Sequence, residues 1–378
     1  MKTLDLQECR RQLDEIDSRI VELFEERMRV CGEVAAYKIE TGKAVYDAER
    51  EKQKLNAVKE MAHGDFNREA VRELFSQLMA MSRRYQYGLL ADHGKTAPME
   101  FREVDRLDKE GARVVFQGVE GAYSHAAVRK FFGDRADAYH VEEFEDTMRE
   151  VEEGRADYAV LPIENSTAGF VIKNYDLLSK YRNYIVGEVY VPICHMLLGV
   201  PGAELSDIRT VLSHPQALMQ SSEYLGAHRE WHQISMQNTA VAAKKVMEDG
   251  DKSQAAVASR TSGELYGLKE LACEINNTKN NTTRFIVLSR EPVYEKQAGK
   301  ISICFEIPHM SGSLYNILGN FIFNHVNMVM IESRPIPEKP FEYRFFVDIE
   351  GKLGEASVQN ALNGIRAEAS VLKILGNY

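Results

Sequence analysis

Residues 114–125 read Val-Val-Phe-Gln-Gly-Val-Glu-Gly-Ala-Tyr-Ser-His, an apolar run followed by two glycines and then by a pattern that predicts a helix from about Ser124. Apolar runs at 158–161 and 210–212 are likewise followed by polar turns and helical patterns, and another apolar run covers 255–258. This alternation of strands and helices predicts a βαβ architecture with mainly parallel sheets.

Polar residues gather in four clusters next to these runs. The clusters are Gly-Val-Glu-Gly-Ala-Tyr-Ser-His at 118–125, Pro-Ile-Glu-Asn-Ser-Thr-Ala-Gly at 162–169, Ser-His-Pro-Gln-Ala-Leu-Met-Gln at 213–220 and Asn-Thr-Thr-Arg-Phe at 281–285. We expect them at strand-to-helix turns, where backbone N–H groups and the helix dipole favour anions. Together they predict one site for a small, oxygen-rich anion. Taken singly, Ser124, Thr167 or Ser213 could be only a helix cap.

The chain has 378 residues, and at ~100–200 residues per domain we expect about three domains. Its formal net charge of −10 argues against nucleic acid as a partner, because phosphate backbones bind basic surfaces. The opening residues carry charges where a signal peptide has its apolar core, and no stretch reaches the ~18 apolar residues of a membrane span. We therefore expect a cytoplasmic protein that does not bind a membrane.

The five cysteines show no Cys-x-x-Cys pair, so buried thiols are expected rather than disulfides or zinc ligands. We expect no metal at the ten histidines either. Neither Gly-x-x-x-x-Gly-Lys-Ser/Thr nor Gly-x-Gly-x-x-Gly occurs, which disfavours a nucleotide site. The sequence also lacks the Gly-x-Ser-x-Gly elbow of many serine hydrolases.

Apolar residues recur with helical spacing from Leu6 to about Tyr37, and this predicted helix would be ~45 Å long. A globule of ninety residues is only ~30 Å across, so we expect a partner chain to cover the overhang. Arg27 and Lys38 lie on the apolar seam, whereas Arg10 projects ~100° away from both. A charge on the seam needs either an acidic partner or an anionic ligand, and the pattern leaves both open.

Two further helices are predicted, one capped by Asp47 and one beginning near Asn67. On the last of these the apolar seam runs into Ser82 and Gln86, which are four residues apart on the same side. Polar groups therefore enter the core of this helical segment.

Residues 4–90 resemble the all-helical class of chorismate mutases. The resemblance assigns active-site positions to Arg10, Arg27, Lys38, Asp47, Arg50, Glu51, Ser82 and Gln86, with Arg10 reaching into the other subunit's site. The rearrangement of chorismate to prephenate needs only a compact conformer and stabilisation of negative charge on the breaking ether oxygen. Lys38 and Gln86 are the candidates for that oxygen, Glu51 is the candidate for the substrate hydroxyl, and arginines can clamp the carboxylates.

Residues 93–112 are polar and predict a linker after an all-α mutase domain at 1–92. The four clusters then resemble prephenate dehydratases over residues 113–290. That family's fold consists of two α/β lobes around a cleft, similar to periplasmic binding proteins. We expect the lobes to divide near residues 190 and 265.

Prephenate must lose its ring hydroxyl and its ring carboxylate together, so the enzyme needs an acid and a grip on the remaining carboxylate. By resemblance Thr283 is the acid, with a role that depends on desolvation, and Arg284 holds a substrate carboxylate. Glu164 could be an acid, an orienting group or a charge that repels wrong anions. We interpret His125 and His214 as structural. The remaining substrate-binding candidates are Ser124, Asn165, Ser166, Thr167, Ser213 and Gln216.

The last eighty residues predict strands at 301–307, 328–334, 343–349 and 370–375, with helices at 312–325 and 357–367. This order, βαββαβ, is that of a ferredoxin-like α+β fold. Residues 299–378 resemble the ACT domains of prephenate dehydratases, whose phenylalanine-binding motifs match at Gly312-Ser313-Leu314 and Glu332-Ser333-Arg334-Pro335. Ser311 and Ser313 replace the family's common Pro and Ala, which leaves the strength of binding open. ACT domains bind ligands between subunits, which implies a homodimer or homotetramer.

Together these resemblances imply a bifunctional enzyme of phenylalanine biosynthesis. It would convert chorismate to prephenate, and prephenate to phenylpyruvate, carbon dioxide and water, under feedback inhibition by phenylalanine. No cofactor is expected. Two alternatives remain: an arogenate dehydratase in the middle domain, or a non-catalytic module that binds an aromatic metabolite.

Overall fold

The computed structural model describes residues 5–95, 100–337 and 339–378. The chain divides into two compact units, one formed by Met1–Met99 with Gly299–Ile374 and the other by Glu100–Ala298 with Leu375–Tyr378. The chain therefore begins the first unit, builds most of the second, returns to the first, and ends with four residues in the second. Residues 96–99 of the predicted linker lie outside the described residues.

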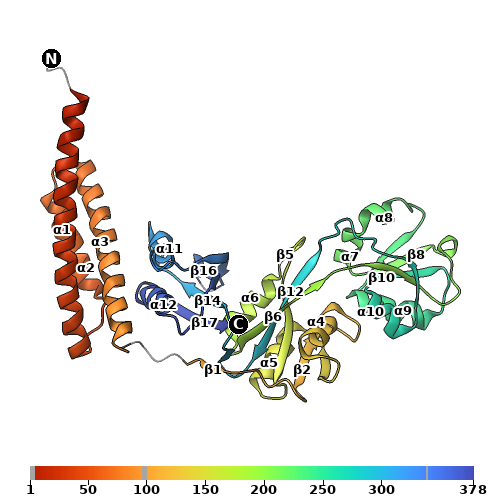
Figure 1. Ribbon diagram of the computed structural model, residues 1–378. Helices are drawn as coiled ribbons and strands as arrows, with labels where there is room; N and C mark the ends of the chain where they lie inside the picture. The colour runs from red at the N-terminus through yellow and green to blue at the C-terminus, as the bar shows by residue number, and fades with distance from the viewer. Residues whose placement is uncertain (1–4, 96–99, 338) are drawn as a thin grey trace. The chain divides into compact units, whose positions relative to one another are not determined.

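Three helices form the N-terminal part of the first unit: α1 (Leu6–Thr41), α2 (Ala48–Met61) and α3 (Asp65–Asp92) (Figure 1). Helix α1 ends at Gly42, which adopts a left-handed conformation with φ of 70° and donates its N–H to the Lys38 carbonyl. Asp47 caps α2 as predicted, because its carboxylate accepts the N–H of Arg50 at 3.0 Å. Helix α3 begins at Asp65, slightly before the expected start.

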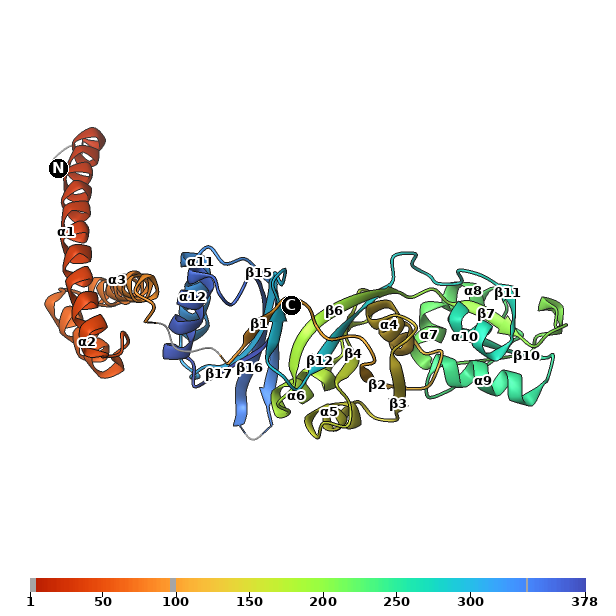
Figure 2. The same cartoon turned by 60° about the horizontal axis from the view of Figure 1, so that its bottom comes forward.

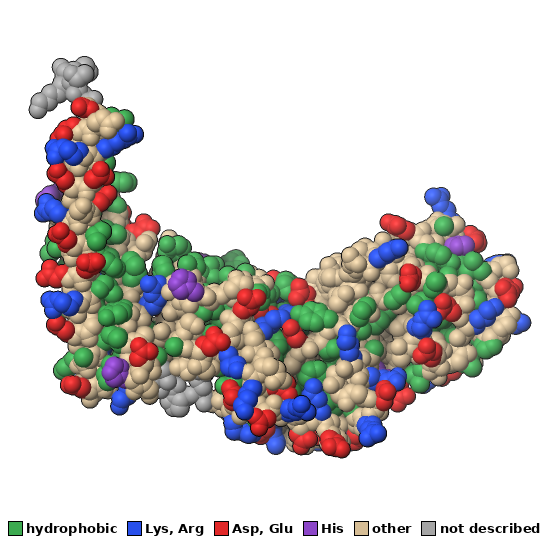
Figure 3. Space-filling model, viewed as in Figure 1, with side chains coloured by type: hydrophobic (Ala, Val, Ile, Leu, Met, Phe, Trp, Pro, Cys, Tyr) green, Lys and Arg blue, Asp and Glu red, His purple; other side chains and the backbone are tan. Residues whose placement is uncertain are grey.

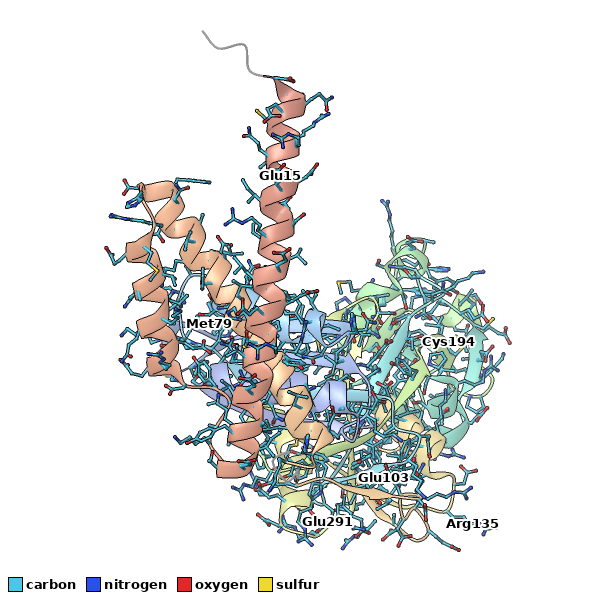
Figure 4. All side chains as sticks on the ribbon, turned by 60° about the vertical axis from the view of Figure 1, so that its left-hand side comes forward. Glu15, Met79, Glu103, Arg135, Cys194 and Glu291 are labelled. Carbon is cyan, nitrogen blue, oxygen red and sulfur yellow. The ribbon has the colours of Figure 1, made fainter. Side chains whose placement is uncertain are left out.

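Much of α1 is not covered within the chain. Leu6, Leu13 and Ile20 lie on the predicted seam and are 62%, 57% and 57% exposed. Figure 3 shows apolar side chains along α1. In Figure 4, Glu15 stands on the outer stretch of α1, away from Met79, which is buried on α3. An exposed apolar stripe of this kind is typical of a helix that packs against another chain.

The C-terminal part of the first unit has the predicted element order βαββαβ. Its elements are β14 (Lys300–Glu306), α11 (Ser313–Phe323), β15 (Met328–Ile336), β16 (Lys339–Glu350), α12 (Ala356–Glu368) and β17 (Val371–Asn377). The strands lie in the order β15-β16-β14-β17, and β16 pairs antiparallel with both of its neighbours. Helix α12 packs against α11 and also against α3 of the same unit (Figure 2).

Besides a two-stranded pair, the second unit contains strands of two larger sheets with helices on their faces (Figure 1). The first sheet contains β2 (Arg113–Gln117), β3 (Asp137–Val141), β4 (Tyr158–Asn165), β5 (Gly169–Phe170), β6 (Tyr184–Pro192) and β12 (Thr282–Ser289). The second contains β7 (Met196–Gly199), β8 (Thr210–Ser213), β9 (His232–Ser235), β10 (Gln254–Ala258) and β11 (Lys269–Ala272). The helices are α4 (Tyr123–Phe132), α5 (Phe144–Glu152), α6 (Ile172–Lys180), α7 (Pro215–Gln220), α8 (Ser222–Gly226), α9 (Thr239–Asp249) and α10 (Arg260–Tyr266).

Both sheets are mixed, so the expectation of mainly parallel sheets was wrong. Strand β2 is parallel to β3 and β4, and β8 is parallel to β9 and β10, as βαβ units require. However, β12 is antiparallel to β4 and β6, and β7 is antiparallel to β10 and β11. The reason is the chain path: β6 leads out toward the second sheet and β12 leads back, so the two run in opposite directions.

The division between the lobes also differs in detail from the expected boundaries. Strand β6 runs to Pro192, close to the expected crossing, but β11 extends the second sheet to Ala272, beyond the expected residue 265. Within the predicted linker, β1 (Arg102–Val104) pairs in parallel with β13 (Val293–Glu295). A three-residue strand is too short to give a recognisable period in the sequence.

Four of the five cysteines are not the buried thiols that were expected. Only Cys304 is a buried thiol, whereas Cys273 is exposed and the other three cysteines are partly buried.

His228 and His232 have the i,i+4 spacing that can mark a metal site on a helix. Here His228 stacks on Trp231 with ring centroids 3.9 Å apart, and His232 begins β9, so the two do not share a helical face.

Candidate active sites

Arg27 and Ser82 bring α1 and α3 together at the first candidate site. The Arg27 guanidinium donates through Nη1 to the Ser82 hydroxyl and to the Leu78 carbonyl, the latter at 3.3 Å. Ser82 is 4% exposed and donates to the Leu78 carbonyl at 2.7 Å. The hydroxyl therefore holds the arginine on the seam where the sequence placed it.

Lys38 and Gln86, the two candidates for the ether oxygen, lie in direct contact. Lys38 Nζ donates to Gln86 Oε1 at 3.1 Å and to the Val45 carbonyl at 2.7 Å. Partial burial lowers the pKa of Lys38, while Asp47 and Glu51 act in the opposite direction. An ether oxygen beside Lys38 could accept from Nζ directly, and from Gln86 only through the amide nitrogen Nε2, because Gln86 Oε1 accepts from Lys38.

Glu51 on α2 lies close enough to Lys38 for their charges to interact. It is held in place by Arg83, a residue that was not among the predicted site residues. Arg83 Nη1 donates to Glu51 Oε2 at 2.5 Å, and Arg83 Nη2 donates to Glu368 Oε1 at 2.7 Å. Arg83 follows Ser82 on α3 and is only 9% exposed. An arginine next to two expected core positions could have suggested a buried ion pair, but no spacing in the sequence identified its partner.

Three of the expected mutase residues are more peripheral. Asp47 and Arg50 are exposed at the start of α2, where Asp47 acts as the helix cap. Arg10 is exposed on α1 and lies ~25 Å along the helix axis from Arg27. It therefore cannot contact the site of its own chain.

In the second unit, a β-bulge brings Asn165 to Thr283. Strand β12 pairs with β4 so that Phe285 lies opposite Pro162, whereas Arg284 lies opposite Glu164 and Thr283 opposite Asn165. The extra residue in β4 reverses which face the following side chains occupy. Asn165 therefore points to the same face as Thr283, and its Nδ2 donates to Thr283 Oγ1 at 2.9 Å.

The orientation of the Asn165 amide is fixed by its other contacts. Its Oδ1 accepts the backbone N–H groups of Thr167 at 3.0 Å and Ala168 at 2.9 Å, which requires an oxygen at that position. Its Nδ2 must then face Thr283 and Asn281, whose Oδ1 it reaches at 2.8 Å. Thr283 Oγ1 accepts from Asn165, so its own proton is available to donate into the site.

Gln220 connects this cluster to the second lobe. Gln220 Nε2 donates to Thr167 Oγ1 at 3.0 Å, and Thr167 Oγ1 donates to Asn165 Oδ1 at 2.8 Å. On its other side, Gln220 Oε1 lies 3.0 Å from Nε2 of the buried His195. Burial lowers the pKa of His195, while the hydrogen bond to Gln220 acts in the opposite direction.

Arg284 does not point toward Thr283. Neighbouring residues of a strand face opposite sides of the sheet, and Arg284 lies on the other side, 3.3 Å from Glu164 and 3.4 Å from Glu188. Its side chain is 8% exposed. The expectation that Arg284 and Thr283 hold the same substrate is therefore contradicted by strand geometry, and Glu164 is an ion-pair partner of Arg284.

The remaining expected residues occupy several different positions. Ser166 donates to the Asn280 carbonyl at 3.1 Å and accepts the Thr282 N–H at 2.9 Å, which ties the β4 turn to β12. The buried Ser213 donates to the Val257 carbonyl at 2.5 Å, within the second sheet. Ser124 is buried in the first turn of α4, and Gln216 is partly buried in α7.

Two of the four polar clusters lie at strand-to-helix turns, as expected: 118–125 between β2 and α4, and 213–220 between β8 and α7. The cluster at 281–285 instead forms the start of β12, and 162–169 leads from β4 into the short strand β5. The two histidines both accept local backbone N–H groups, and their interpretation as structural stays a prediction. His125 accepts the Gly121 N–H at 3.1 Å, and His214 accepts the Gln216 N–H at 3.1 Å.

Comparison with known families assigns the N-terminal helices and the second unit each to a family. The family model of chorismate mutase type II matches residues 9–87, and that of prephenate dehydratase matches residues 114–293. The bifunctional chorismate mutase/prephenate dehydratase of Buchnera aphidicola subsp. Acyrthosiphon pisum is 32% identical over 378 residues, covering 98% of this chain and 95% of that protein. The chain belongs to the family of bifunctional chorismate mutase/prephenate dehydratases.

Other relatives match a part of the chain. An arogenate dehydratase/prephenate dehydratase of Arabidopsis thaliana is 40% identical over 290 residues, covering 72% of this chain and 73% of that protein. The crystal structure of a prephenate dehydratase with L-Phe from Arthrobacter aurescens is 30% identical, with a TM-score of 0.65, and covers 70% of this chain and 89% of that chain. This bifunctional enzyme thus carries a mutase and a dehydratase, which excludes the non-catalytic alternative.

Across residues 5–95, 100–337 and 339–378 of this mutase/dehydratase, no group of three His, Cys, Asp or Glu side chains is arranged to hold a metal. Within the same ranges, no helix combines the length and apolar character of a membrane span. Three residues that belong to the hydrogen-bonded cluster around Asn165 were not among the predicted site residues: Asn281, Gln220 and His195. Gln220 and Asn281 stand at the ends of two quoted clusters, so their place in those clusters was the available signal.

Proposed function

We propose that the mutase reaction takes place among Arg27, Lys38, Glu51 and Gln86. The contact between Lys38 and Gln86 carries this proposal, because it brings the Lys38 ammonium next to the Gln86 amide, so that the ether oxygen of chorismate could accept from Lys38 Nζ and from Gln86 Nε2. Arg27, held by Ser82, binds a substrate carboxylate, and Glu51 accepts the substrate hydroxyl. Neither a nucleophile nor a proton relay is needed for a pericyclic reaction.

Arg10 completes this site from a second copy of the chain. Its distance from Arg27 along α1 and the exposed apolar stripe of that helix both support a homodimer in which two α1 helices pack together. Asp47 and Arg50, at the start of α2, lie at the rim and help to bind the substrate. A homotetramer built from such dimers is equally compatible with this arrangement.

In the dehydratase, Thr283 donates a proton to the departing ring hydroxyl while carbon dioxide leaves. The Asn165 amide supports this role, because it occupies a lone pair of Thr283 Oγ1 and so directs the proton away from itself. Aromatisation of the ring supplies the driving force. Thr167, Gln220 and Ser166 shape the site around Asn165, while Ser124 and Gln216 contact the substrate from the neighbouring helix starts.

Arg284 stabilises the sheet behind the site through Glu164 and Glu188. Prephenate is the physiological substrate of this domain, given the mutase domain that produces it on the same chain. The arogenate alternative remains open to a direct comparison, because a relative's name includes both dehydratase activities. Equal kcat/KM values for arogenate and prephenate would overturn the preference.

Residues 299–378 form an ACT domain through which phenylalanine inhibits the enzyme. The strand order β15-β16-β14-β17 and the element order βαββαβ support this assignment, as does the L-Phe in the related crystal structure. The proposed ligand contacts are Gly312, Ser313 and Leu314 at the start of α11, and Glu332, Ser333, Arg334 and Pro335 on β15. The proposal also includes domains at 1–92 and 113–290, a dehydratase fold similar to periplasmic binding proteins, and a cytoplasmic location.

One experiment tests the two site assignments together. Purified full-length enzyme is given chorismate, and prephenate and phenylpyruvate are followed with and without phenylalanine. Lys38→Ala should abolish prephenate formation but still convert supplied prephenate, whereas Thr283→Val should accumulate prephenate. Parallel loss of both activities in either variant would contradict separate sites, and a phenylalanine-insensitive wild type would contradict the ACT assignment.

A further inference from the structure

Glu51 is tied through one arginine to the C-terminal part of the chain. Arg83 on α3 donates one arm of its guanidinium to Glu51 on α2 and the other to Glu368, the last residue of α12. All three residues belong to the first compact unit. The side chains of Arg83 and Glu368 are 11% and 13% exposed, so this ion-pair chain is largely shielded from water.

The cluster would be unfavourable without its central charge. Two carboxylates share one guanidinium, and burial raises the pKa of Glu368 although Arg83 opposes that shift. Glu368 also stands at the C-terminal end of a helix, where the helix dipole disfavours a negative charge. Neither burial nor position thus favours a carboxylate here, and Arg83 supplies the larger compensating interaction, with a smaller one from a hydrogen bond to Asn320.

The surroundings hold Arg83 in place. Its guanidinium carbon lies 5.2 Å from the centroid of the Tyr46 ring, which favours a cation over its face. Burial raises the pKa of the neighbouring Tyr87 to about 12, so its hydroxyl remains neutral. Arg83 binds Oε2 of Glu51, so the proposed acceptor for the substrate hydroxyl is Oε1.

We propose that Arg83 and Glu368 are positioning residues for the mutase reaction, which makes the mutase site dependent on a carboxylate of the C-terminal domain. Arg83 fixes the rotamer of Glu51, and Glu368 fixes Arg83. The proposal rests on the proposed role of Glu51. The ion-pair chain contributes by alignment, since neither positioning residue contacts the reacting atoms.

The test compares Arg83→Met with Arg84→Met in the full-length enzyme. Arg84 is the next residue on α3 and also contacts the C-terminal domain, with its guanidinium carbon 4.9 Å from the centroid of the Phe323 ring. Only Arg83 reaches Glu51. We expect Arg83→Met to lower mutase kcat by roughly 10- to 100-fold and Arg84→Met to change it by less than about twofold. Dehydratase turnover of supplied prephenate should be unchanged in both variants.

Glu368→Ala probes the far end of the ion-pair chain. It should lower mutase kcat by roughly threefold to tenfold, and the Arg83→Met/Glu368→Ala double variant should be no slower than Arg83→Met alone, because both changes act through one path. Arg83→Lys keeps a cation that can reach one carboxylate and should restore part of the activity. Thermal unfolding of each variant identifies any loss that results from a damaged fold, and Glu368→Ala with Arg83→Lys keeps the test decisive if Arg83→Met does not fold.

The variant Glu51→Gln distinguishes a failure of the positioning proposal from a failure of the proposed role of Glu51. If Glu51→Gln abolishes mutase activity while Arg83→Met and Glu368→Ala do not affect it, the positioning proposal is wrong and the role of Glu51 stands. If Glu51→Gln is fully active, the role of Glu51 itself is wrong. Equal losses in Arg83→Met and Arg84→Met would mean that general packing against the C-terminal domain, rather than the path to Glu51, supports the mutase.

Discussion

Replacing Asn165 by aspartate should reverse the hydrogen bond at the proposed dehydratase acid. In the wild type, Asn165 Nδ2 donates to Thr283 Oγ1 at 2.9 Å, so the threonine proton can point toward the substrate. An aspartate retains the oxygen that accepts from Thr167 and Ala168, but it places a second acceptor against Thr283. The threonine proton would then be held by the carboxylate.

The size of the effect follows from the hydrogen bond that must be broken. A hydrogen bond to a charged group is worth about 1.5–3 kcal/mol, and each ~1.4 kcal/mol changes a rate about tenfold. Asn165→Asp should therefore lower dehydratase kcat by about 10- to 150-fold. The assay is phenylpyruvate formation from saturating prephenate, with mutase activity on chorismate measured as a check on folding.

Asn281→Asp is the matched control for this prediction. Asn281 Oδ1 accepts from the same Asn165 amide at 2.8 Å and Asn281 is 2% exposed, so the substitution adds a similar buried charge but keeps an acceptor in place. We expect a clearly smaller loss than with Asn165→Asp. If the two variants lose activity equally, repulsion of the anionic substrate explains the effect. If Asn165→Asp stays within about threefold of wild type, Thr283 is not the acid.

Two further predictions concern the mutase site and the core. Burial lowers the pKa of Lys38 below that of an exposed lysine, so its ammonium charge is present at low pH and is lost as pH rises through the lowered value. Mutase kcat/KM should therefore fall at alkaline pH, and Lys38→Arg should extend whatever activity it retains to higher pH; identical profiles would contradict a role for this charge. Phe116 is 1% exposed and stacks on His125 with ring centroids 5.1 Å apart. Phe116→Ala should lower the free energy of unfolding by about 3–5 kcal/mol in denaturant titrations, whereas Ile172→Ala, at a position 48% exposed, should change it by less than about 0.5 kcal/mol.

Periodicity predicted the order of helices and strands in the N-terminal and C-terminal regions, but it missed elements of the second unit and did not predict the faces of its sheets. The apolar runs and turn residues predicted the three N-terminal helices, the βαββαβ order of the C-terminal region and several strands of the second unit, but not β3, α5, β6, α9 or β12. The seam of α1 located Arg27 and Lys38. Thr283 and Arg284 are adjacent in one motif, which suggested a shared ligand. Their separation follows from strand geometry, and the register of Asn165 follows from a bulge that periodicity does not predict.

Long-range ion pairs could not be predicted from the sequence either. Arg83 lies between two predicted core positions of α3, and a charged residue at such a position is usually assigned to solvent. Its second partner, Glu368, is 285 residues away and belongs to an element with its own consistent pattern. Local propensity and spacing carry no information about which distant charge meets it.

The ion pair between Arg83 and Glu368 also affects the order in which the protein becomes complete during synthesis. Chains grow at ~5–20 residues per second, so the 285 residues between the two partners take about 14–57 s to translate. During that interval α1, α2 and α3 can form with Arg83 bound to Glu51 alone. A newly made chain would therefore have a folded helical domain well before its mutase site is fully supported, and the mutase would reach full activity only when the end of α12 has been made.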